Sequence, residues 1–412
     1  MKKFINVRLK GRFDPVQILV DDDGIIKEIS PSVSADAETE DLEGRLVVPP
    51  YVDPHIHLDY VYTAESGAMN TLFDGIRKWS ETKGSITPEI LRERALRGIK
   101  QELHKGVQFI RTHVDITDPS LTGLKVLLEL REALKNDVTI QIVAFPQEGI
   151  YAYKGGEELL EESLKMGADC VGGIPHYEFA RELGEKSIHK IVELAVKYNK
   201  MIDVHCDETD DIQSRFLELL NALVYAEGIG RKTAASHTCS FGSADNSYAF
   251  RLMSQLLKSE INFISCPTEN IYLQGRQDTY PKRRGLTRVK ELNDVGINVC
   301  FAQDSMSDPW YPLGNGNMMN ILDHGIHICQ MMSPSEIENA LDLVTVNGAK
   351  TMMIDDYGID VGKSATFIVI DAKSEFEAVC ERAGVLASVR KGRYLFKRKR
   401  VETTDYADIF SV

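Results

Sequence analysis

The chain has 412 residues, enough for two or three domains, so a small fold that depends on disulfides is excluded. Hydrophobic residues make up 43% and charged residues 27% of the chain, which is a globular composition and neither a disordered nor a fibrous one. The formal net charge of −14 repels phosphate backbones and anionic lipid headgroups, so neither nucleic acid nor a membrane is an expected partner.

Cysteine content and the N-terminal sequence indicate a compartment. The seven cysteines are an odd number without close pairing, which is typical of reduced thiols and not of a disulfide framework. Charged residues interrupt the N-terminal segment before an apolar stretch as long as that of a signal peptide. No run in the sequence reaches the ~18–20 apolar residues that cross a bilayer. We therefore expect a cytoplasmic protein.

Both ends of the chain predict β structure. Residues 1–48 offer short strands at Phe4–Leu9, Gln17–Val20 and Gly24–Ile29, joined by turns that contain Asp and Gly. Residues 356–412 offer three more, at Thr366–Ile370, Val385–Arg390 and Tyr394–Lys397. We expect the two ends to form one small β-sandwich domain, interrupted by a larger domain over residues 49–355.

The middle of the chain alternates short apolar runs with amphipathic stretches. The expected strands end near His57, His113, Phe145, Pro175, His205, His237, Ser265 and Asp304. Most intervals are close to the roughly 30 residues that a strand, a loop and a covering helix require, so the pattern predicts a parallel (β/α)8 TIM-like barrel. The first interval is nearly twice as long, which leaves room for an excursion at 60–87 that we expect to reach over the barrel mouth.

Histidines and one aspartate recur at the ends of these strands. His55 and His57 alternate along one strand and therefore point the same way, while His205, His237 and Asp304 end three other strands. Barrel enzymes keep their active sites at the carboxyl ends of the strands. A purely structural role would require five separate burials of costly polar groups, each with its own hydrogen-bond partner. The pattern predicts a metal site.

The ligand types narrow the identity of the ion. Imidazoles with a carboxylate suit zinc, iron or a similar divalent transition ion, with manganese also allowed, and do not suit calcium. A second metal would typically need a bridging lysine carbamate, and the fourth strand region, Cys170–His176, ends without a lysine. We therefore expect one divalent transition metal per chain.

Glu208 lies three residues beyond His205 and can lean over the same mouth. An acid beside a water activated by the ion can move protons between that water and a ring nitrogen of a substrate. The alternative role for Glu208 is an acidic N-cap of the following helix. His113 and His176 also lie at strand ends and could support the site, whereas the remaining histidines fall in helical stretches and are expected to be structural.

Several motifs together resemble the amidohydrolase superfamily, and within it the bacterial cytosine deaminases and their creatinine deaminase relatives. The resemblance covers nearly the whole chain, and its motifs are Pro54–Asp59, Phe145–Gly149, Asp203–Glu208, Ser236–Thr238, Leu273–Arg276, Thr279–Arg284 and Asp308–Gly314.

The resemblance implies roles for individual residues. Metal ligation falls to His55, His57, His205 and Asp304. Proton transfer falls to Glu208, and the hydrolytic water is held by His237 and Asp304. Gln147 is then expected to hold the carbonyl and ring nitrogen of the substrate, with Phe145 and Trp310 as apolar walls. Water and a small molecule are the implied reaction partners, and the family tends to form homo-oligomers.

Two positions depart from the cytosine deaminase pattern. Those enzymes carry a second aspartate, which helps to hold the exocyclic amine, where this chain has Ser305. The seventh strand is followed by a new carboxylate, Glu269, whose role the sequence leaves open. We expect a metal-dependent hydrolytic deaminase of a small cyclic amidine or nucleobase, with cytosine to uracil as the first reaction.

Other reactions and roles remain open beside the conversion of cytosine. Creatinine conversion to N-methylhydantoin is the alternative reaction, because creatinine shares the amidine carbon, and 5-methylcytosine and isoguanine rank behind it. A barrel without catalysis would have lost ligands, and none of the expected ligands is missing. Cyclic-amide ring opening of the hydantoinase kind predicts two metals in place of one.

Overall fold

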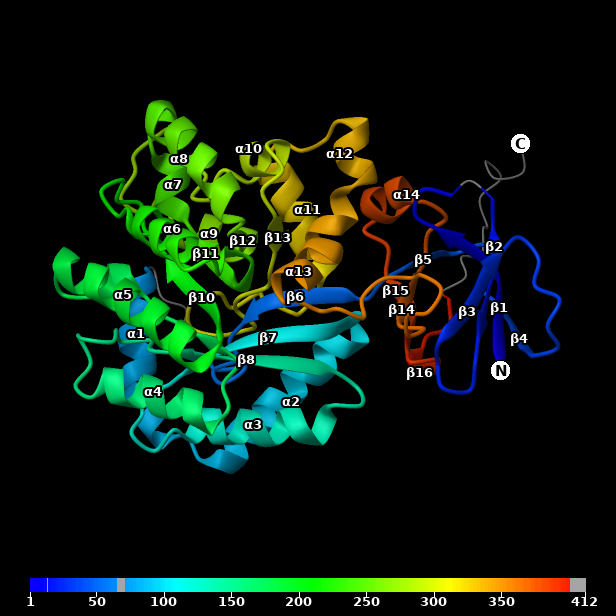
Figure 1. The fold of residues 1–412 in the computed structure, drawn as a ribbon, viewed down its shortest axis with the longest axis horizontal. Coiled ribbons are helices and arrows are strands. Elements are labelled where there is room, and N and C mark those ends of the chain that lie inside the picture. The colour runs from blue at the N-terminus through cyan, green and yellow to red at the C-terminus, as the bar shows by residue number, and fades with distance from the viewer. Residues whose placement is uncertain (13, 65–70, 401–412) are drawn as a thin grey trace, which may run out of the picture. The chain divides into compact units, whose positions relative to one another are not determined.

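The computed structural model describes residues 1–12, 14–64 and 71–400, drawn as ribbons in Figure 1. These residues divide into two compact units. Residues 50–357 form one unit, and residues 1–49 together with 358–412 form the other. Among the residues that the structure describes, no helix is both long enough and apolar enough to cross a lipid bilayer.

The larger unit is a parallel β-barrel. Its eight strands pair in the order β13-β12-β11-β10-β9-β8-β7-β6, and a parallel bridge between Ile56 and Asp304 joins the first strand to the segment after the last. The strands are β6 (Tyr51–Ile56), β7 (Val107–Asp115), β8 (Thr139–Phe145), β9 (Cys170–Val171), β10 (Met201–Cys206), β11 (Thr233–His237), β12 (Asn262–Ser265) and β13 (Val299–Phe301). The TIM-barrel fold predicted from the strand–helix rhythm is confirmed.

Helices follow the strands and cover the sheet (Figure 1). The first half of the barrel carries α2 (Pro88–His104), α3 (Thr122–Leu134), α4 (Gly156–Met166), η3 (Pro175–Tyr177) and α5 (Arg181–Tyr198). The second half carries α6 (Phe216–Ala226), η4 (Gly230–Lys232), α7 (Cys239–Ser243), α8 (Asn246–Ser259), α9 (Pro267–Leu273), α10 (Val289–Asp294), α11 (Met318–Ile328), α12 (Pro334–Glu338), η5 (Ala340–Val344) and α13 (Val346–Thr351).

Local sequence explains where these helices begin and end. The Thr87 side chain accepts a hydrogen bond from the backbone N–H of Ile90, and Pro88 occupies the first turn of α2, where its missing N–H costs nothing. Helix α4 ends at Gly167, whose φ of +118° suits glycine because a Cβ would be strained there.

One barrel strand is shorter than the sequence predicts. Strand β9 ends at Val171, whereas the apolar run predicted an end at Pro175. Gly172 continues one more hydrogen bond, from its N–H to the carbonyl oxygen of Ala144 at 2.9 Å, and a Cβ on Gly172 would lie 2.7 Å from that same oxygen. The chain therefore crosses close to β8 at this point before it turns outward.

The excursion predicted over residues 60–87 contains α1 (Leu72–Thr82) and the short helix η2 (Lys83–Ser85), and its residues 65–70 lie outside the described residues. Helix α1 contacts segments that follow two barrel strands. The indole N–H of Trp79 donates to Asp115 at the end of β7, at 2.9 Å. The indole N–H of Trp310, after β13, donates to the carbonyl of Leu72 at 3.1 Å. The excursion therefore lies at the carboxyl ends of the strands.

The smaller unit is one path of paired strands from both chain ends, in the order β16-β15-β14-β5-β1-β2-β3, with β4 paired to β1. Buried side chains from both ends, among them Phe4, Ile18 and Phe367, share one core. Its elements are β1 (Lys2–Leu9), β2 (Val16–Val20), β3 (Ile26–Ser30), β4 (Glu38–Asp41), β5 (Leu46–Val48), β14 (Phe367–Ile370), α14 (Glu375–Cys380), β15 (Val385–Arg390) and β16 (Arg393–Lys397).

The apolar run from Leu46 to Asp53 reads as one strand in the sequence but is two strands in the structure. Strand β5 pairs with β1 and β14 in the smaller unit, whereas β6 pairs with β7 in the barrel. The break falls at Pro49 and Pro50, which have no backbone N–H to donate to a ladder.

Candidate active site

The predicted metal ligands converge at the carboxyl end of the barrel. His55 and His57 come from the end of β6, His205 from β10, and Asp304 from the segment that follows β13. Ligand atoms of these four residues all lie within 4.8 Å of one another, and all four side chains are buried. The alternation along β6 and the parallel order of the strands therefore bring together residues that are far apart in the sequence.

The backbone at two of these positions is in the left-handed region. His237, the last residue of β11, has a φ of 68°, and Asp304 has a φ of 65°. Such a conformation is uncommon outside glycine and costs of order 1–3 kcal/mol, so it persists only where the surrounding structure imposes it. At Asp304, hydrogen bonds to β6 impose it, because its N–H donates to the carbonyl of His55 at 2.7 Å and its carbonyl accepts from the N–H of His57 at 3.2 Å.

The nitrogen and oxygen atoms of the cluster face a common point. The Asp304 Oδ1 lies 3.5 Å from the Nε2 of His55 and 3.4 Å from the Nε2 of His57. The Nε2 atoms of His57 and His205 are 3.2 Å apart, and the buried Nε2 of His55 has no hydrogen-bond partner among the described residues. Three imidazole nitrogens and one carboxylate oxygen directed at one point suit a divalent transition cation.

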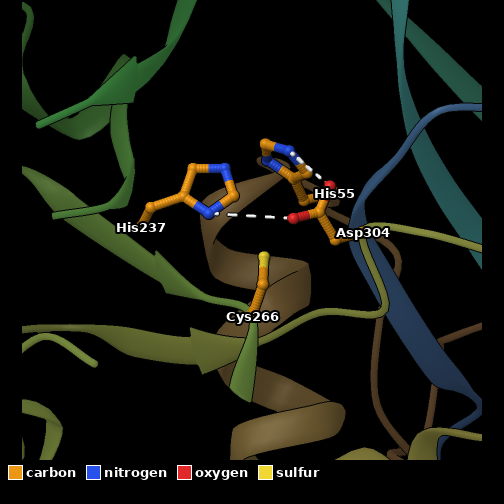
Figure 2. Close-up of side chains that lie close together, drawn as sticks. All are labelled: His55, His237, Cys266 and Asp304. Atoms are coloured by element: carbon orange, nitrogen blue, oxygen red, sulfur yellow. Dashed lines mark ion pairs between the residues drawn. The ribbon is translucent and has the colours of Figure 1, made fainter. Parts of the chain in front are cut away.

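A second set of possible ligands shares two members with the first. Figure 2 shows His55, His237, Cys266 and Asp304 grouped together, and their ligand atoms also lie within 4.8 Å of one another. Cys266 follows β12 and was not among the predicted site residues, although its place directly after a barrel strand is the same signal that identified the histidines. Burial raises the pKa of the Cys266 thiol well above its ordinary value, which favours the uncharged thiol over a thiolate ligand.

The electrostatics keep the imidazoles neutral. Burial lowers the pKa of His57 to about 4 and those of His55 and His205 well below their ordinary value. Burial alone would raise the pKa of Asp304, but the imidazoles of His237 and His57 outweigh it and the pKa lies below its ordinary range. Neutral imidazoles beside an ionised carboxylate are the protonation states that metal binding requires.

Glu208 lies beside this cluster and is almost completely buried, with 3% of its surface exposed. Its Oε1 accepts a hydrogen bond from the amide Nδ2 of Asn270 at 3.2 Å and lies 3.5 Å from the Nδ1 of His237. Burial, reinforced by the charge of Asp304, raises the pKa of the Glu208 carboxyl well above its ordinary value. A carboxyl with a raised pKa holds its proton to higher pH than an exposed one, which is the property that a general acid needs.

The alternative role of Glu208 as a helix cap is taken by its neighbour. The carboxylate of Asp207 accepts from the backbone N–H groups of Phe216 and Leu217 at 3.1 and 2.9 Å, at the start of α6, and from the hydroxyl of Ser214 at 2.6 Å. Asp207 therefore satisfies the helix terminus, and Glu208 is free to face the site.

Asn270, in α9, was not predicted from the sequence. Its amide nitrogen also lies 3.2 Å from the Nδ1 of His237, so one side chain links Glu208 and His237. Nothing in the sequence around Asn270 distinguishes it from a capping or surface asparagine, because its partners come from β11 and the segment after β10.

The aromatic residues expected as walls pack around the histidine cluster, Phe145 directly and Trp310 through Tyr60. The ring of Phe145 stacks on His205, with centroids 4.0 Å apart and planes at 13°. Trp310 packs against Tyr60 at 4.5 Å, and Tyr60 in turn stacks on His57 at 4.5 Å with planes at 14°. Tyr60 was not predicted as a site residue, although it directly follows the Pro54–Asp59 motif.

The remaining predicted positions are buried near the same end of the barrel. Gln147, after β8, is 3% exposed, and its Oε1 has no partner among the described residues. Ser305 is 2% exposed and directly follows Asp304. Glu269, in the first turn of α9, is 2% exposed with an unpartnered Oε2, and burial raises its pKa well above the ordinary value. The site thus holds an amide acceptor, Gln147, and two carboxyl groups, Glu208 and Glu269, whose pKa values are raised by burial.

The sequence and fold are similar to those of known enzymes. The family model described as "Amidohydrolase family" matches residues 38–396. N-isopropylammelide isopropyl amidohydrolase of Pseudomonas sp. (strain ADP) is 28% identical over 91% of this chain and 92% of its own length. Pterin deaminase of Rhizobium rhizogenes is 27% identical over 90% of this chain and 86% of its own length.

A solved structure is more similar still. The crystal structure of 5-methylcytosine deaminase from Klebsiella pneumoniae, liganded with phosphonocytosine, is 48% identical. It superposes with a TM-score of 0.95 over 98% of this chain and 100% of that chain.

Proposed function

Because the chain belongs to the amidohydrolase family, we propose that it is a metal-dependent hydrolytic deaminase of a cytosine ring, with 5-methylcytosine as its substrate. The observation that carries this proposal is the 48% identity to the Klebsiella pneumoniae 5-methylcytosine deaminase over 98% of this chain. In the proposed reaction water replaces the exocyclic amino group of 5-methylcytosine, and the products are thymine and ammonia. The order of candidates inferred from sequence, with cytosine first and 5-methylcytosine behind creatinine, is revised accordingly.

We assign the metal to the four-residue cluster of His55, His57, His205 and Asp304. The buried, unpartnered Nε2 of His55 and the 3.2 Å separation of the Nε2 atoms of His57 and His205 support this assignment, because a cation bound among these nitrogens would accept their lone pairs. A divalent transition ion held by these residues would supply a water-derived nucleophile near neutral pH, because such ions lower the pKa of water. Zinc, iron and manganese all suit the donor set.

Glu208 and His237 move the protons in the proposed reaction. Glu208 donates its carboxyl proton to the ring nitrogen next to the amino-bearing carbon. The Glu208 carboxylate then takes the proton of the newly added hydroxyl group and passes it to the amine, which leaves as ammonia while the hydroxyl oxygen becomes the carbonyl oxygen of the product. His237 accepts the other proton of the attacking water, for which its buried, unpartnered Nε2 is available, and this proton returns to Glu208 after ammonia has left. The Nδ2 of Asn270 lies 3.2 Å from both the Oε1 of Glu208 and the Nδ1 of His237, so Asn270 holds these two side chains next to each other.

Gln147, Phe145, Trp310 and Ser305 form the proposed substrate contacts. In this proposal the unpartnered Oε1 of Gln147 accepts from the ring N–H of a pyrimidine, its amide nitrogen donates to the carbonyl, and the Phe145 ring gives the substrate an apolar face. Ser305 stands where cytosine deaminases have an aspartate. The methyl group of 5-methylcytosine lies on the carbon next to the amino-bearing carbon. An aspartate facing this methyl group would lose its hydration without a new partner, whereas the shorter, uncharged Ser305 would not, so serine at this position favours the methylated ring.

Release of ammonia from a panel of compounds tests this function. Purified protein loaded with zinc is assayed with 5-methylcytosine, cytosine, creatinine and isoguanine, and the product is identified by its absorbance. We expect the highest kcat/KM with 5-methylcytosine and weaker turnover of cytosine. Turnover of creatinine alone would replace the proposed substrate, and silence across the panel with one metal per chain bound would refute the proposal. A content of two metals per chain would instead favour hydantoinase-type ring opening.

A further inference from the structure

A buried chain of hydrogen bonds runs from His55 to the adjacent strands. The Nδ1 of His55 lies 3.0 Å from the hydroxyl oxygen of Ser236, and that hydroxyl lies 2.6 Å from the Oδ1 of Asp203. His55, Ser236 and Asp203 have no exposed surface, and they come from β6, β11 and β10. The contact between His55 and Ser236 joins residues 181 positions apart.

The direction of each hydrogen bond follows from the chemistry of its partners. An ionised carboxylate can only accept, so the single hydroxyl proton of Ser236 is donated to Asp203. The oxygen of Ser236 then offers only lone pairs to His55, and the His55 Nδ1 must be the donor. A neutral imidazole with its proton on Nδ1 carries its lone pair on Nε2. That Nε2 is the atom that faces the Oδ1 of Asp304 at 3.5 Å.

Arg111 holds the far end of this chain in place. Its guanidinium lies 2.9 Å from the Oδ2 of Asp203, and its other nitrogens donate to the Oε1 of Gln141 at 3.0 and 2.9 Å and to the carbonyl of Thr351 at 3.1 Å. Arg111 is 1% exposed, so its charge and that of Asp203 compensate each other inside the barrel. The carboxylate is thereby kept ionised and fixed in position.

His113 packs against the same groups. Its ring lies over the ring of His55, with centroids 3.8 Å apart and planes at 31°, and its Nε2 is 3.4 Å from the Oδ1 of Asp203. The ring of His55 thus contacts His113 on one face and Ser236 at one edge, and both contacts restrict its orientation.

We infer that Ser236 and Asp203, backed by Arg111, are positioning residues that fix the tautomer and orientation of His55 for metal binding. The inference rests on the proposed function, in which His55 is a metal ligand. None of the three residues is among the proposed metal ligands, substrate contacts or proton carriers. Groups that orient a metal-binding histidine through its other ring nitrogen typically change metal affinity by about 10- to 100-fold when they are removed.

The zinc affinity of the apoprotein tests this role without any measurement of catalysis. Zinc is titrated into wild-type, Ser236→Ala, Ser236→Thr and Ser265→Ala apoproteins in competition with a chromophoric chelator. Ser265 is a matched control, because it is a fully buried serine at the end of β12 whose hydroxyl has no partner among the described residues. We expect Ser236→Ala to bind zinc about 10- to 100-fold more weakly, with Ser265→Ala unchanged and Ser236→Thr restored toward wild type.

The outcomes separate this inference from the proposed function. If wild type binds one zinc and His55→Ala loses it, but Ser236→Ala binds as tightly as Ser265→Ala, the positioning role is wrong and the ligand role stands. If wild type takes up no zinc, or His55→Ala binds as tightly as wild type, the ligand role fails and the inference with it.

A spectroscopic measurement serves where Ser236→Ala does not fold. The ring nitrogens of histidine-labelled wild-type apoprotein are observed by nitrogen-15 NMR, and the His55 signals are identified by their loss in His55→Asn. We expect the shifts of an imidazole protonated on Nδ1. Shifts of the tautomer protonated on Nε2 would overturn the inference.

Discussion

Replacement of Glu208 by glutamine tests the assignment of the proton donor. The two side chains have nearly the same volume, and the glutamine oxygen can still accept the hydrogen bond that Asn270 donates at 3.2 Å. Glu208 is 3% exposed, so bulk solvent has little direct access to the carboxyl position. The substitution therefore removes the transferable proton and little else.

The magnitude follows from the role. A positioned general acid contributes about 10²- to 10⁴-fold to the rate. We therefore expect kcat/KM of Glu208→Gln to fall by that factor, which corresponds to about 3–5 kcal/mol of transition-state stabilisation. The affinity for zinc should change little, because Glu208 is not among the four proposed ligands. The folded state should be at least as stable, because burial already disfavours the ionised carboxylate.

Steady-state kinetics with 5-methylcytosine, zinc content and thermal unfolding are measured on the same preparations. The reasoning is refuted if Glu208→Gln retains more than about a tenth of the wild-type kcat/KM while it holds one zinc. A loss of activity that is matched by a loss of zinc would instead make Glu208 a ligand.

Three further outcomes are expected. Removal of metal with a chelator should abolish ammonia release, and added zinc should restore it; full activity of metal-free protein, verified by elemental analysis, would contradict the metal assignment. Gly75→Ala should lower the thermal midpoint and raise the KM for 5-methylcytosine, because the new Cβ would lie 2.2 Å from the Nε1 of Trp310 and overpacking costs about 1–3 kcal/mol. An unchanged midpoint and KM would show that the Trp310 side chain can move aside without cost. Arg111→Met should destabilise the fold by about 3–5 kcal/mol, because it leaves the Asp203 carboxylate buried without its cation. Urea unfolding measures this loss, and the double variant Arg111→Met with Asp203→Asn should recover part of the lost free energy of unfolding.

The barrel and the clustering of the candidate ligands could be predicted because their signals are local. Strand alternation places His55 and His57 on one face, and a parallel sheet brings every strand end to one rim. Where a local signal misled, the cause was also local. The run from Leu46 to Val52 carries no charged residue, and the paired prolines within it mark where it divides between two sheets.

Other features of the site depend on contacts between distant segments. Asp207 and Glu208 are adjacent acids, and only the position of α6 shows that Asp207 caps the helix while Glu208 faces His237. In the same way, Tyr60 and Asn270 are ordinary residues until their stacking on His57 and their bridge to Glu208 are seen.

The sequence by itself determined the chemistry available to this protein: a parallel barrel with imidazoles and carboxylates at one rim. Only the tertiary structure decided which atom of each residue is used. The proton on the Nδ1 of His55 is assigned through Ser236 and Asp203, on two other strands. The periodicity of a strand fixes the face on which a side chain lies, but hydrogen-bond direction depends on partners that folding brings within 3 Å.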